Sequence, residues 1–388
     1  MKIIMIYDFS KPTNRLHTNS YKWDSAPNDD IIPLWVADMD FETYPAITEA
    51  LQRRVAHGIF GYTRVPDAYY ESVCQWFAKH HGWSINRSDI IYTSGVVPAI
   101  SAIIKALTLP GDQVIVQGPV YNCFYSSIRN NGCEMVSNSL IYNKETLRYE
   151  MDFEDLDRKL SHERARIMLL CNPHNPGGRV WSREELTHVA ELCKKHGVRV
   201  VSDEIHCELT LHGNEYTPFG SLPDKLSFGS ITCCSPSKAF NIAGLQIANI
   251  VCRDAAVRER VDRTININEV CDVNPFGVEA LMAAYTDGGE EWLMELRKYL
   301  SDNYDMLLEF FARHLPQLPV VRMEGTYLAW VDCSSLGEAS EEIEERLMKK
   351  NKVWVNAGSM YGKEGEHFIR INMACPRERL EEGLRRIA

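Results

Sequence analysis

The middle of the chain alternates short apolar runs with longer segments whose apolar residues recur at helical spacing. Six of the runs are nearly all apolar, as expected of strands buried on both faces: residues 90–93, 113–117, 166–171, 199–203, 230–234 and 247–252. Helical segments between such strands are typical of a largely parallel sheet with helices on both faces. We therefore expect an α/β fold for this part of the chain.

Residues with known end preferences mark several of the helices. Ser182 is followed by Glu185 in the spacing of a capping box, and Gly197 is placed to end the same helix. A proline at the start and a glycine at the end likewise predict helices over residues 45–58 and 66–82.

The pattern changes near residue 289, where a second, smaller unit begins. We expect a long helix over about 291–314, a charged helix at 338–350, a last helix, and strands at 319–323, 327–332, 353–356 and 367–372. We interpret residues 46–289 as a large domain and 290–388 as a small α+β domain, with the segment 1–45 packed against the small domain. A chain of 388 residues exceeds one ordinary core, which agrees with two domains.

Composition narrows the range of partners and compartments. The net charge is −11, from 42 Lys and Arg against 53 Asp and Glu, and without a basic run it argues against a nucleic acid or an anionic membrane as partner. An apolar stretch near the start is ended by Asp8 and is too short for a signal peptide or a membrane span. Twelve cysteines without a CxxC pair indicate free thiols, so we expect a cytoplasmic protein.

Three segments at predicted strand ends carry an amide, an acid and a lysine in order. Their key residues are Asn175 in Asn-Pro-His-Asn-Pro-Gly-Gly, Asp203 in Ser-Asp-Glu-Ile-His, and Lys238 in Ser-Pro-Ser-Lys. These are the groups needed to hold pyridoxal 5′-phosphate (PLP). Lys238 can bond to the cofactor's aldehyde, Asp203 can pair with the pyridinium nitrogen, and Asn175 can donate to the ring oxygen. Apolar neighbours of Lys238 lower its pKa by desolvation, which this chemistry requires.

Further residues complete the expected cofactor site. The hydroxyls of Ser235 and Ser237, just before the lysine, suit phosphate oxygens. The backbone N–H groups of a predicted helix start suit them too, at Gly95, Val96 and Val97. Tyr121 follows the strand at 113–117, where its ring can stack on the pyridine and its hydroxyl can assist proton movement.

A downstream arginine is the candidate for substrate binding. Arg370 lies among apolar residues of a predicted strand, and an inward arginine needs an anion. A substrate α-carboxylate fits its fork, and an internal ion pair is the alternative. The histidines match no metal-binding motif, so we expect no metal site and a functional role only for His206, beside the cofactor aspartate. Motifs for nucleotide binding and triad hydrolysis are absent from the sequence.

The sequence resembles the fold-type-I PLP enzymes of the class I/II aminotransferase group, and among them the MalY/PatB-type cystathionine β-lyases. The likeness rests on the asparagine loop and on Thr-Asn-Ser-Tyr-Lys-Trp-Asp at 18–24, Leu-Trp-Val-Ala-Asp-Met-Asp-Phe at 34–41 and Gly-Tyr-Thr at 61–63. It implies a PLP-dependent transferase-like fold, with a mostly parallel seven-stranded sheet in the large domain and a small α+β domain.

The resemblance also implies roles for individual residues. Lys238 would carry the cofactor, Asp203 would pair with its ring, Asn175 and Tyr121 would contact it, and Arg370 would bind the substrate carboxylate. It further implies a homodimer in which Tyr62 reaches the phosphate of the neighbouring subunit. Trp35, Asp38 and Asp40 would line the substrate pocket.

Two departures from the wider group favour the lyase branch. His206 stands where many aminotransferases have a tyrosine, and Gln246 where many have a phosphate-binding arginine. The predicted reaction is β-elimination from cystathionine or a related S-substituted L-cysteine, which gives a thiol, pyruvate and ammonia. Lys238 would take the Cα proton, and either Lys238 or Tyr121 would protonate the leaving sulfur. The alternatives are an aminotransferase and a regulatory PLP-binding protein without turnover.

Overall fold

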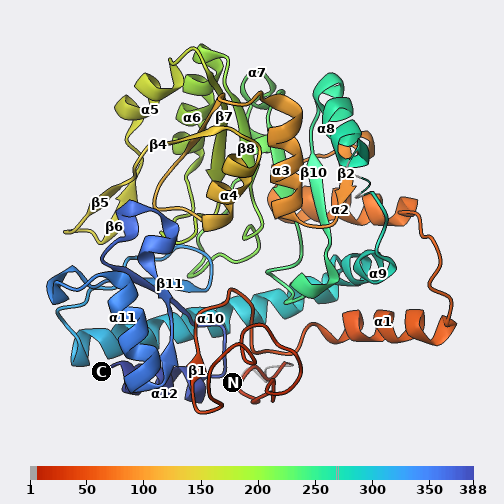
Figure 1. The fold of residues 1–388 in the computed structure, drawn as a ribbon. Helices are drawn as coiled ribbons and strands as arrows, with labels where there is room; N and C mark the ends of the chain where they lie inside the picture. Colours follow the sequence, from red (N-terminus) through yellow and green to blue (C-terminus); the bar gives the residue numbers. More distant parts are fainter. Residues whose placement is uncertain (1–6, 268, 270) are drawn as a thin grey trace.

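A seven-stranded sheet forms the centre of the computed structural model, which describes residues 7–267, 269 and 271–388. Its strands, in spatial order, are β2 (Ile90–Thr93), β10 (Ala248–Val251), β9 (Ile231–Cys234), β8 (Arg199–Asp203), β7 (Ala165–Cys171), β3 (Gln113–Val116) and β4 (Glu134–Ser137). All neighbours run parallel except β10, which is antiparallel to both of its neighbours. The expected α/β fold with a mostly parallel sheet is therefore confirmed (Figure 1).

Six of the seven strands coincide with the predicted apolar runs. The seventh, β4, escaped prediction because it lies at the sheet edge and begins with exposed residues, Glu134 and Met135. Helices cover one face of the sheet: α3 (Val96–Leu107), α4 (Asn122–Asn130) and α8 (Ala255–Ile267). Others cover the opposite face: α2 (Asp67–His81), α5 (Phe153–Leu160) and α6 (Arg183–His196).

The predicted helix ends agree with the structure. The side chain of Ser182 accepts a hydrogen bond from the Glu185 N–H while Glu185 accepts one from the Ser182 N–H, and Gly197 ends α6 with a left-handed φ of 68°. The remaining helices of the large domain are α1 (Pro45–His57), α7 (Asp224–Ser227) and α9 (Pro275–Ala284), and a hairpin joins β5 (Ile141–Asn143) to β6 (Arg148–Glu150).

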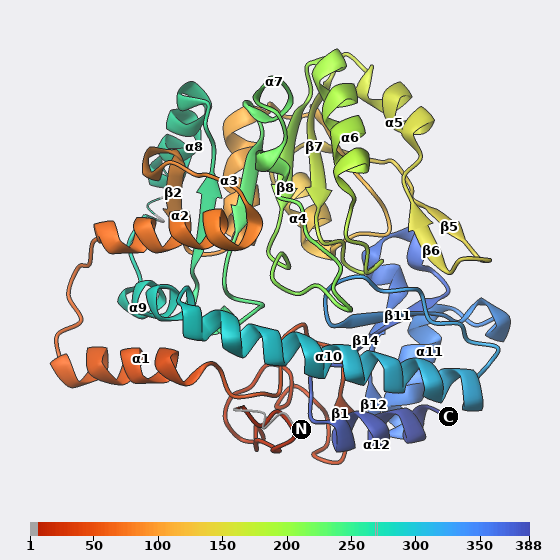
Figure 2. The ribbon, with the colours of Figure 1, turned by 180° about the vertical axis from the view of Figure 1, so that it is seen from behind.

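The small domain contains a three-stranded antiparallel sheet, in the order β11 (Leu328–Asp332), β14 (Phe368–Asn372) and β13 (Asn356–Ala357). Its helices are α11 (Ser340–Arg346) and α12 (Arg377–Ile387), and α10 (Asp287–His314) runs along the molecule to join the two parts (Figure 2). The predicted strand at 319–323 is wrong. Val320 forms only an isolated bridge with Val331, and the Met323 N–H donates to the Tyr304 hydroxyl instead of to a neighbouring strand.

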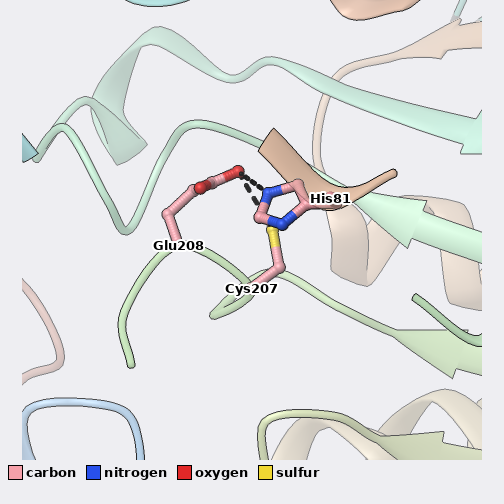
Figure 3. A group of neighbouring side chains, drawn as sticks. All are labelled: His81, Cys207 and Glu208. Atoms are coloured by element: carbon pink, nitrogen blue, oxygen red, sulfur yellow. Dashed lines mark hydrogen bonds and ion pairs between the residues drawn. The ribbon is translucent and has the colours of Figure 1, made fainter. Parts of the chain in front are cut away.

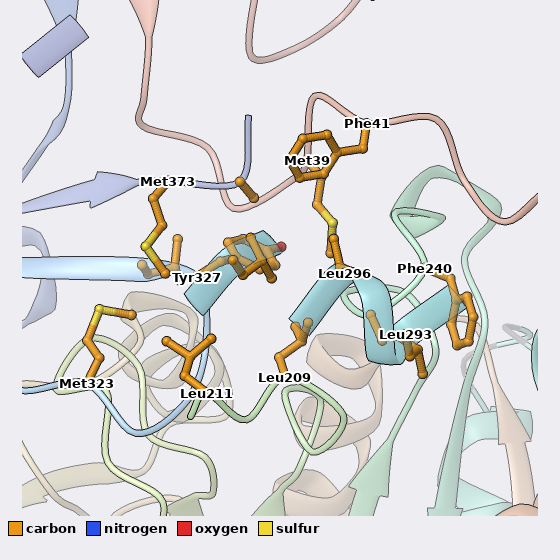
Figure 4. Close-up of a cluster of buried hydrophobic side chains, with 14 of the residues drawn as sticks. Met39, Phe41, Leu209, Leu211, Phe240, Leu293, Leu296, Met323, Tyr327 and Met373 are labelled. Carbon is orange, nitrogen blue, oxygen red and sulfur yellow. The ribbon is translucent and has the colours of Figure 1, made fainter. Parts of the chain in front are cut away.

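The N-terminal segment contacts both parts of the chain. Its strand β1 (Ile32–Pro33) pairs in parallel with β12 (Val353–Trp354) of the small domain. Met39 and Phe41 enter a buried cluster together with Leu296 of α10, Phe240 and Tyr327 (Figure 4). The first six residues, which include most of the apolar stretch before Asp8 and the start of the predicted segment 1–45, lie outside the described residues. The predicted domain boundaries stay predictions.

A buried ionic cluster holds this segment in place. The Asp40 carboxylate accepts hydrogen bonds from Arg15 at 2.8 Å, Arg379 at 3.2 Å and the Trp23 indole at 3.0 Å. The ammonium of Lys22, which is 0% exposed, lies 3.2 Å from the same carboxylate. Asp40 therefore neutralises buried cations.

Replacing Asp40 with alanine will destabilise the protein by about 3–5 kcal/mol, because Lys22 and two arginines lose their common counter-ion inside the structure. Urea unfolding at neutral pH measures the change. As a control, Asp29→Ala removes an exposed carboxylate that pairs only with an exposed histidine, and we expect a change within about 0.5 kcal/mol. Equal stabilities of the two variants would contradict the assignment.

Candidate active site

A cavity lies at the carboxyl end of the central strands. Its wall is formed by Ala37, Val96, Val97, Tyr121, Cys171, Asn175, Asp203, Ile205, His206 and Lys238. Asp203 is the last residue of β8, while Asn175 and Lys238 each follow a strand by four positions, β7 and β9. Because the carboxyl ends of parallel strands share one edge of a sheet, these side chains, remote in sequence, meet there.

Lys238 is half-buried and faces this cavity. Its Nζ donates a hydrogen bond of 2.6 Å to the carbonyl of Ala37, which also accepts a hydrogen bond from the Tyr327 hydroxyl at 3.0 Å. Desolvation, with a smaller contribution from the Arg370 charge, lowers the pKa of Lys238 to about 8. A substantial fraction of the amine is therefore neutral, and nucleophilic, near physiological pH.

Asp203 is buried close to this lysine. Its carboxylate accepts a hydrogen bond from the Ile205 N–H at 3.1 Å. Desolvation raises the pKa of Asp203 to about 7, since this bond and the Lys238 charge offset only part of the cost of burial. The site is thus built to receive a cationic N–H group, which would restore the ionised carboxylate.

Asp203→Asn will separate stability from activity. The pKa of Asp203 is raised in the folded, cofactor-free chain. Between about pH 4 and pH 7 the folded chain therefore keeps a proton on this carboxyl that the unfolded chain has released. The free energy of unfolding falls as pH rises through this window. We expect the variant to be more stable than wild type at pH 8, by at most about 4 kcal/mol, and equal to it near pH 4. Urea unfolding of the cofactor-free proteins checks this. The variant loaded with cofactor will have lost most of its turnover. A stability difference in favour of the variant that grows as pH falls would contradict the prediction.

Arg370 comes from β14 of the small domain and is only 4% exposed. Its Nη1 donates to Asn175 Oδ1 at 3.1 Å, and its Nη2 donates to the Trp35 carbonyl at 2.9 Å and to Asn356 Oδ1 at 3.0 Å. Its Nε is buried without a hydrogen-bond partner, and no carboxylate of the described residues forms an ion pair with it. The internal ion pair left open by the sequence is therefore absent from the described part of the chain, and the guanidinium remains available to an anionic ligand.

Tyr121 and His206 supply the remaining polar groups of the wall. Tyr121 stands at the start of α4, and desolvation together with Cys123 raises the pKa of its hydroxyl far above the usual value. Desolvation, reinforced by the nearby Lys238 and Arg370 charges, holds the pKa of His206 well below its ordinary range. His206 is therefore neutral, and its Nδ1 is buried without a hydrogen-bond partner in the described part of the chain.

The predicted phosphate ligands have two different environments. Val96 and Val97 form the first turn of α3 after Gly95, so their backbone N–H groups lack helical partners, and both residues border the cavity. The Ser235 hydroxyl lies 2.7 Å from the Ser237 hydroxyl and also contacts the Ile247 carbonyl. The phosphate role of the two serines stays a prediction.

Several predicted residues lie outside the cavity wall, among them Tyr62 and the predicted substrate-pocket residues Trp35, Asp38 and Asp40. Tyr62 is 100% exposed, in the segment between α1 and α2 at the edge of the molecule (Figure 1). Trp35 presents its carbonyl to Arg370, while its ring stacks on Trp354 with centroids 4.0 Å apart. Sequence reasoning overlooked Ala37, which belongs to the 34–41 segment that carried the resemblance but contributes only a backbone carbonyl.

None of the helices in the described part of the chain is both long and apolar enough to cross a membrane.

Comparisons with known proteins identify the family of the chain. Residues 29–387 match the family described as aminotransferase class I and II. The cystathionine β-lyase PatB of Bacillus subtilis (strain 168) is 44% identical over 384 residues, which cover 98% of each chain. Two solved structures also align over 98% of both chains: a PLP-bound putative aminotransferase from Clostridium difficile 630, with a TM-score of 0.95 and 39% identity, and a PLP-bound C–S lyase from Staphylococcus hominis, with a TM-score of 0.90 and 33% identity. The chain therefore belongs to the aminotransferase class I and II family.

Proposed function

We propose that the chain is a PLP-dependent β C–S lyase that cleaves L-cystathionine or a related S-substituted L-cysteine to a thiol, pyruvate and ammonia. The observation that carries the proposal is the buried guanidinium of Arg370, without a carboxylate partner among the described residues, beside the cavity that holds Lys238 and Asp203. An amino acid supplies the missing carboxylate. The lyase relatives support the choice of reaction.

The residues of the cavity fit the cofactor group by group. Asp203, whose pKa burial raises, gains from a pyridinium N–H, and the first turn of α3 offers N–H groups to a phosphate. Lys238 supplies the amine for the covalent bond, and the Asn175 amide nitrogen can donate to the ring oxygen while its Oδ1 serves Arg370. When bound, PLP withdraws electrons from the substrate's Cα.

The chain's own residues then divide the work. Arg370 pairs with the substrate carboxylate through the N–H groups that its protein partners leave free, and so fixes the direction of the Cα–H bond. With the cofactor in place, the amine of Lys238 would take the Cα proton of the substrate. A proton must then reach the sulfur that departs from Cβ, and both Lys238 and Tyr121 border the cavity where it leaves.

An aminotransferase is the second candidate, because a solved structure similar to this chain is described as a putative aminotransferase. Both reactions begin with loss of the Cα proton, and they differ in the steps that follow this loss. His206 and Gln246, in place of the tyrosine and arginine of many aminotransferases, favour the lyase.

The deciding experiment gives PLP-loaded protein L-cystathionine without any 2-oxo acid and follows pyruvate and free thiol. Pyruvate and thiol in equal amounts over many turnovers will support the lyase. Conversion of one cofactor per chain to its amine form, without thiol, would identify an aminotransferase. If neither thiol nor the amine form of the cofactor appears, both candidates are refuted.

We also propose a homodimer in which Tyr62 completes the phosphate site of the neighbouring subunit. The support is the exposure of Tyr62 and of two apolar side chains next to it, Ile59 and Phe60. The twelve cysteines, all free in the structure, support a location in the reducing cytoplasm.

Mixing two inactive variants will test the placement of Tyr62. Tyr62→Ala and Lys238→Ala chains are unfolded together and refolded, so that mixed dimers form. If Tyr62 acts across the interface, each mixed dimer contains one intact site, and the mixture recovers about a quarter of the wild-type turnover. Refolded single variants are the controls. A mixture as inactive as its components, with mixed dimers shown by mass spectrometry, would place Tyr62 in its own subunit's site or outside the site.

A further inference from the structure

A second group of potential ligands includes the two residues that follow the wall residue His206 in sequence. His81 at the end of α2 and Cys207 and Glu208 in the loop after β8 point toward one another (Figure 3). The His81 Nε2 lies 2.9 Å from Glu208 Oε1, and the Cys207 Sγ lies 3.6 Å from the same oxygen. All three potential ligand atoms lie within 4.8 Å of one another, and this is the only such group among the described residues.

The donor types suit a divalent transition metal. Imidazole nitrogen, thiolate sulfur and carboxylate oxygen together are typical of zinc, which takes four ligands in a tetrahedron at about 2.0–2.3 Å. Neighbouring ligand atoms of such a tetrahedron are about 3.3–3.7 Å apart. The two pairs that include Glu208 Oε1 are 2.9 and 3.6 Å apart and the third lies within 4.8 Å, so metal binding requires the side chains to adjust. They also line an open polar pocket, from which water can supply the fourth ligand.

The Glu208 carboxylate has one oxygen engaged by neighbouring side chains and one without a partner among the described residues. Its side chain is buried, yet Oε2 has no hydrogen-bond partner among the described residues, while Oε1 accepts a hydrogen bond from the Trp76 indole at 2.7 Å. Burying a carboxylate oxygen without a partner is costly. The Trp76 bond orients the carboxylate from outside the ligand group, as outer partners do in metal sites.

We propose that His81, Cys207 and Glu208 bind one divalent transition metal ion, with Zn²⁺ the expected occupant. The ion takes the place of the Cys207 thiol proton, which leaves to solvent together with any proton on His81; no electron transfer is involved. The ligand loop continues directly from Asp203 and His206, and the Cys207 N–H donates to the Glu204 carbonyl at 3.0 Å. Metal binding therefore clamps the loop that forms part of the cofactor cavity. The proposal does not depend on which reaction the enzyme catalyses.

Equilibrium dialysis of the PLP-loaded enzyme with ZnCl₂, followed by elemental analysis, measures the stoichiometry and affinity. We expect one Zn²⁺ per chain in wild type and in Cys193→Ser, which changes an equally buried thiol elsewhere. Cys207→Ser replaces the thiol with a hydroxyl of nearly equal volume, and we expect it to weaken Zn²⁺ binding by more than about 100-fold. Loss of a residue that only hydrogen-bonds to a metal ligand typically weakens metal binding 10- to 100-fold. Co²⁺ will give the intense visible absorption of a four-coordinate thiolate site in wild type and in Cys193→Ser, but not in Cys207→Ser.

The outcomes decide the proposal clearly. Failure of wild type to retain Zn²⁺, or equal retention by wild type and Cys207→Ser, would overturn it. If Cys207→Ser does not fold, alkylation of the wild-type enzyme serves as the test. Mass spectrometry identifies the modified cysteines. Zn²⁺ must slow the modification of Cys207 and leave that of Cys193 unchanged. Equal rates of Cys207 modification with and without Zn²⁺ would also overturn the proposal.

Discussion

Lys238→Ala will lose both the covalent bond to the cofactor and nearly all turnover. In the proposed mechanism the side chain supplies the amine that bonds to PLP, with a pKa lowered to about 8, and acts as the base at the substrate's Cα. Loss of general acid–base assistance alone reduces a rate by about 10²–10⁴-fold, and loss of the covalent attachment adds to this. Borohydride reduction followed by peptide mass spectrometry will find the cofactor mass on the Lys238 peptide in wild type and on no peptide of the variant.

The matched control is Lys225→Ala, which removes an exposed lysine. It will keep wild-type attachment and turnover. The variant at 238 will still fold, because its side chain contributes only one hydrogen bond, to the Ala37 carbonyl. An active Lys238→Ala enzyme would remove the basis of the proposed mechanism.

Strand-end residues were predictable because the relevant signal is local. Asp203 follows a run of apolar residues and ends β8, and Lys238 and Asn175 follow other such runs at the same spacing. Parallel strands bring their carboxyl ends together, so strand positions alone placed these residues in one site. The edge strand β4 lacked this signal, since half of its residues are exposed.

Contacts between remote segments could not be predicted in the same way. Arg370 meets Asn175 across 195 positions and Trp35 across 335, so nothing near Arg370 reveals whether its partner is a carboxylate. The Ala37 carbonyl is a backbone group and leaves no mark on composition or spacing. His81 and Glu208, separated by 127 positions, follow no motif and are brought together only when α2 packs beside the loop after β8.

Arg370→Met will show whether the substrate is held by its carboxylate. Truncating one partner of a buried, hydrogen-bonded charge pair costs about 2–5 kcal/mol, so kcat/KM for L-cystathionine should fall roughly 30- to 5,000-fold. Arg370→Lys keeps the charge but loses the planar fork, and we expect it to recover only a small part of this loss. The control Arg377→Met changes a more exposed arginine of the same domain, and its kinetics will remain near wild type.

A substrate analogue without the carboxylate separates carboxylate binding from general damage to the site. Arg370 also donates to Asn175 and Asn356, so its loss could disturb the cavity as a whole. Such damage would weaken binding of the decarboxylated amine as much as that of the amino acid. If Arg370 acts through the carboxylate, wild type and Arg370→Met will bind the amine with nearly equal affinity, measured by the change in cofactor absorption, and will differ only for the amino acid. Equal losses for both ligands would assign Arg370 to the architecture of the cavity and leave the substrate carboxylate without its proposed partner.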